Sequence, residues 1–213
     1  MERVTDAFAW PVRDPEWPVK VLIIGLALLI PIVGAINGLG WMLATLDRLR
    51  AGEERLAPAN LGYLGRGVRL FAVQLVYSLA VALVAAIIYL PAVLIAVSQG
   101  HGNGNAGLIL ASLLLNLLAF GVTTIGSLAL TFATPAIVLA TDAGGVGGGL
   151  AVREIVRRVR ENPTNTLIAG LMLIAAGLIS SLGLIACFVG VLFTTAYALA
   201  VQAWVYRSFE SGS

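Results

Sequence analysis

The 72 residues from Leu70 to Thr141 contain no Lys, Arg, Asp or Glu, although the chain has 13 basic and 11 acidic residues elsewhere. A soluble helix needs a charged outer face, whereas a helix that crosses a bilayer does not. One crossing takes about 20 apolar residues, and this stretch is rich in Leu, Ala, Val and Ile. The pattern therefore predicts an integral membrane protein rather than a soluble domain.

The composition supports an all-α, polytopic membrane protein made of one domain, residues 1–213. Only 11% of the residues are charged and 59% are hydrophobic, whereas about 25% are charged in soluble domains. The net charge of +2 is too small to indicate nucleic acid as a partner, so membrane lipids are the expected partners. The single cysteine, Cys187, lies in an apolar run, which excludes a disulfide framework and favours a buried thiol.

The first part of the chain has an interfacial segment and then a stretch with two interpretations. Residues 1–20 mix charges of both signs, and Asp14 is expected to cap a helix that begins at Pro15. The uncharged residues 21–46 form either one tilted span of about 39 Å or a short helical hairpin. The hairpin, which would turn between Pro31 and Gly34, is preferred, and its turn would have to be buried against protein.

The middle of the chain predicts two full spans. Residues 51–69 are polar and rich in turn-forming residues, which predicts a segment on the cytoplasmic surface. Residues 70–97 and 106–141 are the predicted spans, the first kinked or ended near Pro91 and the second broken by glycine or Pro135. The loop between them, which contains His101, is expected outside, and residues 142–149 are expected to be a flexible glycine hinge.

Residues 150–161 predict a basic amphipathic helix on the membrane surface. Val152, Ile155, Val156 and Val159 share one face. The arginines expected to contact anionic lipid are Arg153, Arg157, Arg158 and Arg160. The alternative is a solvated helix that only obeys the positive-inside rule.

A C-terminal hairpin, residues 166–206, follows Asn162-Pro163 and brings the total to about four full transmembrane helices. With the N-terminal hairpin, every basic segment lies on one side, which is the cytoplasmic side of a prokaryotic inner membrane.

No residue pattern indicates catalysis, a cofactor or a metal. Residues 144–149 are glycine-rich but lack the Gly-Lys-Ser/Thr ending of a phosphate-binding loop, and the chain has one histidine. The predicted spans contain no ionisable residue of the kind that couples transport to protons. The chain is therefore predicted not to be an enzyme. A lipid-modifying activity through Asp47, Asp142 or Glu154 would need a carboxylate with a strongly perturbed pKa.

Uncharged polar residues form one stripe on the third apolar run, namely Asn116, Thr123, Ser127, Thr131 and Thr134. Such residues either bond to neighbouring helices and to their own backbone, or line a polar cavity. The second interpretation predicts a protein that binds or passes a small or lipidic ligand, as a homo-oligomeric pore or with a partner membrane subunit. The alternative is a structural protein that shapes the membrane with its first hairpin and its basic helix.

Both ends of the chain carry motifs of one family. The opening has Asp14-Pro-Glu-Trp17, Leu29-Ile-Pro-Ile-Val-Gly34 and Leu46-Asp-Arg-Leu-Arg50, and the ending has Asn162-Pro163 and Ile185-Ala-Cys-Phe-Val-Gly190. The chain resembles an uncharacterised prokaryotic family of multi-helix membrane proteins, a domain-of-unknown-function family. It departs from the family pattern after Pro58, where an acidic and aromatic stretch is expected. The resemblance implies a helical membrane fold and brings no activity or functional residues.

Overall fold

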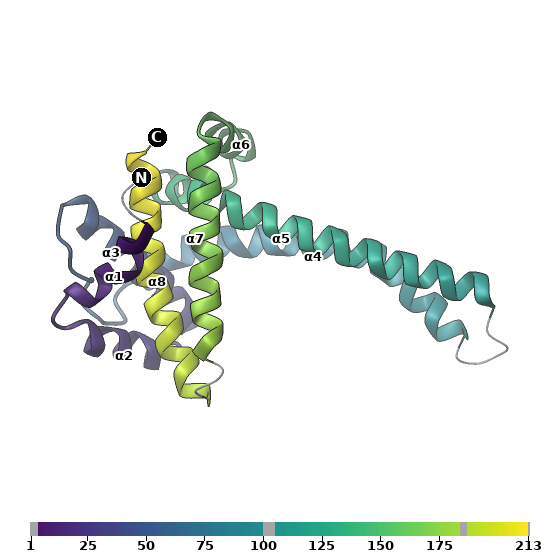
Figure 1. Cartoon of the computed structure of the whole chain (residues 1–213), viewed down its shortest axis with the longest axis horizontal. Coiled ribbons are helices and arrows are strands. Elements are labelled where there is room, and N and C mark those ends of the chain that lie inside the picture. The colour runs from purple at the N-terminus through teal and green to yellow at the C-terminus, as the bar shows by residue number, and fades with distance from the viewer. Residues whose placement is uncertain (1–3, 100–104, 184–186, 213) are drawn as a thin grey trace. The chain divides into compact units, whose positions relative to one another are not determined.

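The computed structural model describes residues 4–99, 105–183 and 187–212, and within these ranges the chain has eight α-helices, a short 3-10 helix and no strand (Figure 1). The elements are α1 (Val4–Ala9), η1 (Trp10–Arg13), α2 (Trp17–Ala27), α3 (Val33–Arg50), α4 (Leu64–Gln99), α5 (Ala106–Gly149), α6 (Val152–Glu161), α7 (Pro163–Leu182) and α8 (Cys187–Ser211). The predicted all-α class is confirmed. His101 and the side chain of Cys187 lie outside the described part.

Three of the described helices, α4, α5 and α7, are long and apolar enough to cross a membrane. The chain divides into two units, which are described separately. Unit 1 contains residues 1–73 and 131–213, and unit 2 contains residues 74–130.

Helix α8 forms the core of unit 1. Small residues such as Ala196, Ala200 and Ala203 are fully buried on it, and they let α2, α3 and α7 pack closely against it. The indole of Trp10 stacks on Trp204 of α8 with 5.9 Å between the ring centroids, which holds the N-terminal segment on the same helix. Figure 1 shows α7 and α8 running side by side.

Residues 17–50 form two helices rather than one. The chain leaves α2 at Ala27 and enters α3 at Val33 through Ile32, which has a φ of 66°. A Cβ atom at Gly34 would overlap the carbonyl oxygen of Ala27, so the two helices meet only because residue 34 is glycine. Helix α2 begins at Trp17 rather than at the predicted Pro15, and Asp14 accepts a hydrogen bond from the Glu16 N–H (2.9 Å) just before the helix instead of capping its first turn.

The segment 56–63, here called the strap, lies along one face of α3. The Oγ1 atom of Thr45 accepts a hydrogen bond from the Ala57 N–H (3.2 Å), and the Trp41 indole donates to the Ala57 carbonyl (3.0 Å). One turn earlier on α3, Asn37 donates to the Asn60 carbonyl (2.9 Å) and accepts from the Tyr63 N–H (3.2 Å). These side chains replace the backbone partners that an extended segment lacks.

The predicted surface segment 51–69 is therefore only partly a surface segment. Leu56 and Ala57 are buried, and the chain is already helical from Leu64, six residues before the predicted start of the span at Leu70. Most of the polar and turn-forming residues, Pro58, Asn60 and Gly62 among them, are exposed as predicted. What the prediction missed is the pairing of the strap backbone with side chains of α3.

Unit 2 is a pair of helices, the α4 segment 74–99 and the α5 segment 106–130. Helix α4 continues through Pro91 to Gln99, and α5 continues through Pro135, so the predicted end near Pro91 and the predicted break of the second span are both wrong. Membrane-type helices accommodate proline when neighbours satisfy the freed carbonyl groups. Within the expected glycine hinge at 142–149, α5 is kinked at Gly145, which has a φ of 61°, and is helical on either side of it; the flexibility of this hinge stays a prediction.

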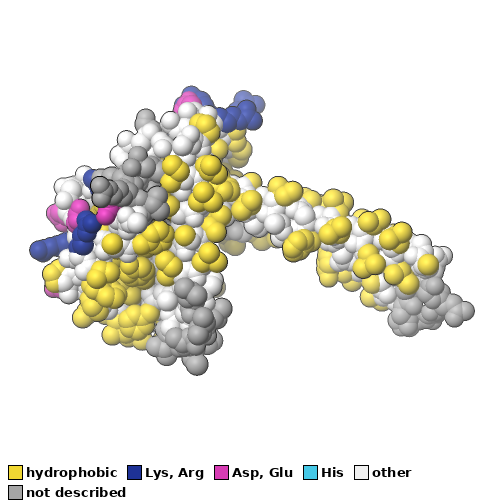
Figure 2. All heavy atoms as spheres, viewed as in Figure 1, with side chains coloured by type: hydrophobic (Ala, Val, Ile, Leu, Met, Phe, Trp, Pro, Cys, Tyr) yellow, Lys and Arg dark blue, Asp and Glu magenta, His cyan; other side chains and the backbone are white. Residues whose placement is uncertain are grey.

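Figure 2 shows many apolar side chains on the visible face of unit 2, and no charged ones among its described residues. Leu83, Ile87, Leu117, Phe120 and Ile125 are each between 63% and 71% exposed. Soluble monomers seldom expose an apolar surface of this extent.

Candidate functional site

Five charged side chains from four helices meet in unit 1, and they are here called the charged cluster. They are Asp47 and Arg50 of α3, Arg66 of α4, Asp142 of α5 and Glu210 of α8. Arg50 makes a two-pronged ion pair with Glu210 (Nε–Oε2 2.8 Å, Nη2–Oε1 3.0 Å). The same guanidinium also donates to Asp142 (2.8 Å) and to Asp47 (3.1 Å).

Arg66 joins the same two aspartates from α4. Its Nε and Nη2 atoms donate to Oδ1 of Asp142 (3.0 and 2.6 Å), and it also forms an ion pair with Asp47. Both carboxylate oxygens of Asp142 are thus engaged, and its side chain is only 9% exposed. The cluster connects the end of α3, the first turn of α4, Asp142 and the end of α8.

The charges of the cluster stabilise one another in their ionised forms. Burial alone would raise the pKa of Asp47, but hydrogen bonds from Arg66 and Arg50 outweigh burial and lower the pKa. Burial opposes the charge of Arg50, yet its bonds to Glu210 and Asp142 raise its pKa. A carboxylate that is stabilised as an anion is a weak proton acceptor, which does not suit a catalytic base. The ion pairs of the cluster act instead as a clamp between the helices of unit 1.

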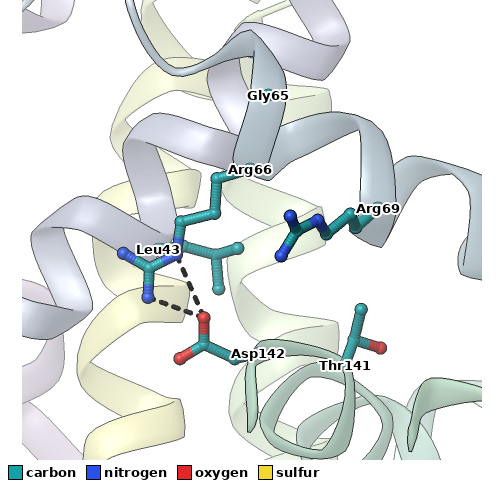
Figure 3. A pocket seen from close by; sticks show the side chains of 6 residues that line it. All are labelled: Leu43, Gly65, Arg66, Arg69, Thr141 and Asp142. Carbon is teal, nitrogen blue, oxygen red and sulfur yellow. Dashed lines mark hydrogen bonds and ion pairs between the residues drawn. The ribbon is translucent and has the colours of Figure 1, made fainter. Parts of the chain in front are cut away.

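A cavity of about 400 Å³ lies beside the cluster and is lined by Leu43, Gly65, Arg66, Arg69, Thr141 and Asp142 (Figure 3). The guanidinium of Arg69 is turned toward this cavity (Figure 3). Among the residues that the structure describes, Arg69 has no hydrogen-bond or ion-pair partner. A guanidinium in this state can bind a phosphate or carboxylate group with two parallel hydrogen bonds.

Unit 2 contains an apolar groove of about 670 Å³, lined by Ala82, Ala85, Ala86, Tyr89, Asn116, Ala119, Phe120 and Thr123. The side chains of Asn116 and Thr123 donate to carbonyl groups of their own helix, those of Ser112 and Ala119, each at 2.8 Å. The oxygen of the Asn116 amide and the hydroxyl of Tyr89 have no partner within the described chain.

The predicted polar stripe is divided in the structure. Asn116 and Thr123 line the groove, whereas Ser127 does not. Thr131 and Thr134 belong to the part of α5 in unit 1. Whether these residues line a cavity in a membrane stays a prediction.

The four arginines of α6 fall into two pairs. Arg157 forms ion pairs with Glu154 (2.7 Å) and Glu161 (3.5 Å), and Arg158 forms one with Glu154 (3.2 Å). In the described part of the chain, Arg153 and Arg160 have no such partner. Hydrogen bonds from Arg158 and Arg157 lower the pKa of Glu154, so this carboxylate does not have the raised pKa that a general acid needs.

Several residues that organise unit 1 are not among the predicted site residues. Asn37, Trp41 and Thr45 recur every four residues within an apolar run, which was the one available signal for a polar face. The Arg50–Glu210 pair joins residues 160 positions apart, and no local pattern indicates it. The buried ion pair of Asp14 with Lys20 (2.8 Å) spans only six positions, but nothing in those positions shows that it will be buried.

A comparison with family models matches residues 23–189, more than half of the chain, to a family described as Protein of unknown function (DUF4013). The predicted resemblance to an uncharacterised family is thereby confirmed. Searches of curated proteins and of solved structures found no match to the chain.

Proposed function

Because this chain belongs to the DUF4013 family, whose function is unknown, we propose its role from the two units themselves. The chain is an integral protein of a prokaryotic cytoplasmic membrane, is not an enzyme, and binds a lipidic ligand in the groove of unit 2. The proposal of a lipidic ligand rests on one observation, the apolar groove of unit 2.

The exposed surface of unit 2 supports the membrane location. Its helical segments, 74–99 and 106–130, measure about 39 and 37 Å at about 1.5 Å per residue, more than the ~30 Å of a bilayer's hydrocarbon core. Exposed side chains such as Leu83 and Phe120 are stable against acyl chains and unfavourable against water. Helix α7 of unit 1 has the length and composition of a further span.

The charged cluster supports the orientation. It gathers Arg50 and Arg66 with the ends of α3, α4 and α8 at one place in unit 1. Basic residues next to spans remain on the cytoplasmic side, so this end of unit 1 faces the cytoplasm.

The lining of the groove supports a lipidic ligand. Four alanines, Ala82, Ala85, Ala86 and Ala119, leave space between the helices that larger side chains would fill. Sites for apolar ligands combine such a lining with a few polar groups that orient the ligand. The Tyr89 hydroxyl and the Asn116 amide oxygen supply these groups and suit a chain that carries a hydroxyl or amide.

The test fills the groove and measures the lipid that remains bound. Ala82→Leu with Ala119→Leu occupies the groove, while Ala80→Leu with Ala129→Leu adds the same volume at exposed positions that do not line it. Each protein is purified in mild detergent, and its bound amphiphiles are identified by native mass spectrometry. We expect the wild type and the control to retain one class of amphiphile and the groove variant to lose it. Equal retention by both variants would refute the groove as the binding site.

The same spectra give the mass of the assembly. A discrete homo-oligomer favours passage of the ligand through a pore between subunits. A single chain that retains a second protein favours a membrane subunit of a larger transporter.

A second candidate function, shaping of the membrane, is favoured by the turn between α2 and α3. Leu29, Ile30 and Ile32 are 51%, 46% and 64% exposed there, which suits insertion into one leaflet as a wedge. Replacing Leu29 and Ile30 by Ser should then reduce the curvature that the protein induces in reconstituted vesicles. Vesicles of unchanged shape would reject this function and leave the groove proposal intact.

A further inference from the structure

Helix α6 has a buried side and an exposed side. Ile155 is only 3% exposed and fixes the helix to unit 1, and the Thr166 hydroxyl of α7 donates to the Val159 carbonyl (3.3 Å). On the exposed side, Val152 and Val156 are 54% and 41% exposed. Single exposed valines are common on protein surfaces and do not by themselves indicate a function. The function of this side of α6 is therefore inferred from the charges beside the valines.

Helical geometry places Val152, Arg153, Val156 and Arg160 on one stripe. Val156 lies four residues after Val152, three after Arg153 and four before Arg160, and at 3.6 residues per turn the four side chains fall within about 100° of one another around the helix. Arg153 and Arg160 are also the two arginines of α6 without an ion-pair partner in the described chain. The stripe therefore combines two exposed apolar side chains with two free guanidinium groups.

The other charges of α6 compensate one another. Arg157 and Arg158 pair with Glu154 and Glu161, so these four residues have no net charge. The helix contains four arginines and two glutamates, and its excess of two positive charges is carried by Arg153 and Arg160 alone.

We propose that the stripe Val152, Arg153, Val156 and Arg160 binds the anionic phospholipid surface of one leaflet. The two valines enter the boundary between headgroups and acyl chains, and the two guanidinium groups bind lipid phosphates. This inference rests on the proposed membrane location and is independent of the ligand in the groove.

The position of α6 in the chain favours a lipid surface over another anionic partner. Only Asn162 separates α6 from α7, which begins at Pro163 and is long and apolar enough to cross a membrane. A helix joined so closely to a span lies at the bilayer surface. Two free cations are also too few for nucleic acid, whose binding proteins typically contact about six or more phosphates.

The experiment uses the full chain in nanodiscs of phosphatidylcholine, with and without phosphatidylglycerol. A fluorophore that reports a dry environment is attached at Val152→Cys in a Cys187→Ser background, and brominated acyl chains serve as the quencher. The Arg153→Gln/Arg160→Gln pair is compared with the matched Arg157→Gln/Arg158→Gln pair, which removes the same charge. The ratio of phosphatidylglycerol to phosphatidylcholine that each protein retains in detergent is the second readout.

We expect phosphatidylglycerol to increase quenching. The Arg153→Gln/Arg160→Gln pair should reduce the retained lipid ratio by up to roughly 30-fold, since each basic residue near the surface contributes about fivefold. The Arg157/Arg158 pair should change it little. Val152→Ser with Val156→Ser, labelled at Leu150→Cys, should lower quenching without a change of charge. Equal losses for both arginine pairs, or no response to phosphatidylglycerol, would overturn the assignment.

A second label separates this inference from the membrane proposal. Leu83→Cys on α4 should be quenched by brominated lipid in every nanodisc. If Leu83 is quenched but α6 does not respond, only the inference about α6 fails. If Leu83 is not quenched, the membrane location itself fails.

Discussion

The backbone N–H of Leu56 donates a hydrogen bond of 2.9 Å to the carboxylate of Asp14, although 42 positions separate the two residues. The same carboxylate oxygen accepts from the ammonium group of Lys20 (2.8 Å). The Leu56 carbonyl in turn accepts from Lys20 (3.3 Å) and Arg48 (3.4 Å). The start of α2, the end of α3 and the start of the strap are thus joined through one residue.

The first prediction concerns this buried ion pair. Asp14→Ala should lower the free energy of unfolding in detergent by roughly 1–3 kcal/mol, because it removes the closest anion of the Lys20 ammonium group and the acceptor of the Leu56 N–H, while Glu16 remains 3.1 Å from that ammonium group. The comparison is Asp6→Ala, which removes an exposed pair with Arg13 and should have no measurable effect. Similar effects of the two substitutions would contradict a special role for Asp14.

The second prediction is a loss of stability in acid. Burial would raise the pKa of Asp14, but hydrogen bonds from Lys20 and from the N–H groups of Glu16 and Leu56 outweigh burial and lower it. Because the folded pKa lies below the unfolded value of about 3.9, this stabilisation is complete above that value and is lost as the pH falls through the folded pKa. Thermal unfolding between neutral pH and pH of about 3 should show the loss. In Asp14→Asn the loss should be smaller, and an identical pH profile would disprove the assignment.

The third prediction uses two glycines of the first turn of α4. A Cβ atom at Gly67 would overlap the carbonyl oxygen of Ile36, whereas one at Gly65 would meet nothing within 4 Å. Gly67→Ala should therefore destabilise the protein by roughly 1–3 kcal/mol through forced separation of α3 and α4. Gly65→Ala should be neutral, or stabilise by up to about 1 kcal/mol through its higher helix propensity. Chemical denaturation of both variants in detergent decides between these outcomes.

The fourth prediction concerns the pair Arg50–Glu210. A double-mutant cycle with Arg50→Met and Glu210→Gln should give a coupling free energy of up to about 1 kcal/mol, since both side chains are partly exposed and water screens them. Because the charges are near the surface, the coupling should weaken as salt is added. A coupling that is zero at low salt would show that the pair does not hold α3 to α8.

Some elements of this fold were predictable because what surrounds their side chains determines which residue types they contain. The charge-free stretch predicted the helices of unit 2, whose side chains face outward and must therefore be apolar. The alternation of Val and Arg predicted α6, which the structure places at Val152–Glu161. Both patterns are visible in the sequence because the type of each residue follows from the surroundings of its own side chain.

Other elements depend on partners far away in the chain. The polar residues of the strap read as a surface loop, because nothing in residues 56–63 shows that Asn37, Trp41 and Thr45 will satisfy their backbone. The glycines at 142–149 predicted a hinge, and the structure has a kink there at Gly145 with helix on either side. In the candidate site, the pairs of Arg50 with Glu210 and of Arg66 with Asp142 join residues 160 and 76 positions apart, so no local pattern predicts them.

The strap also sets an order for the synthesis of this protein. When α3 leaves the ribosome, the side chains of Asn37 and Thr45 have no partner until residues 57–63 have been made. Arg50 has Asp47 within its own helix at once, but its pair with Glu210 forms only when α8, far later in the chain, has been made. The contacts of α3 are therefore completed in steps, first with the strap and only later with α8.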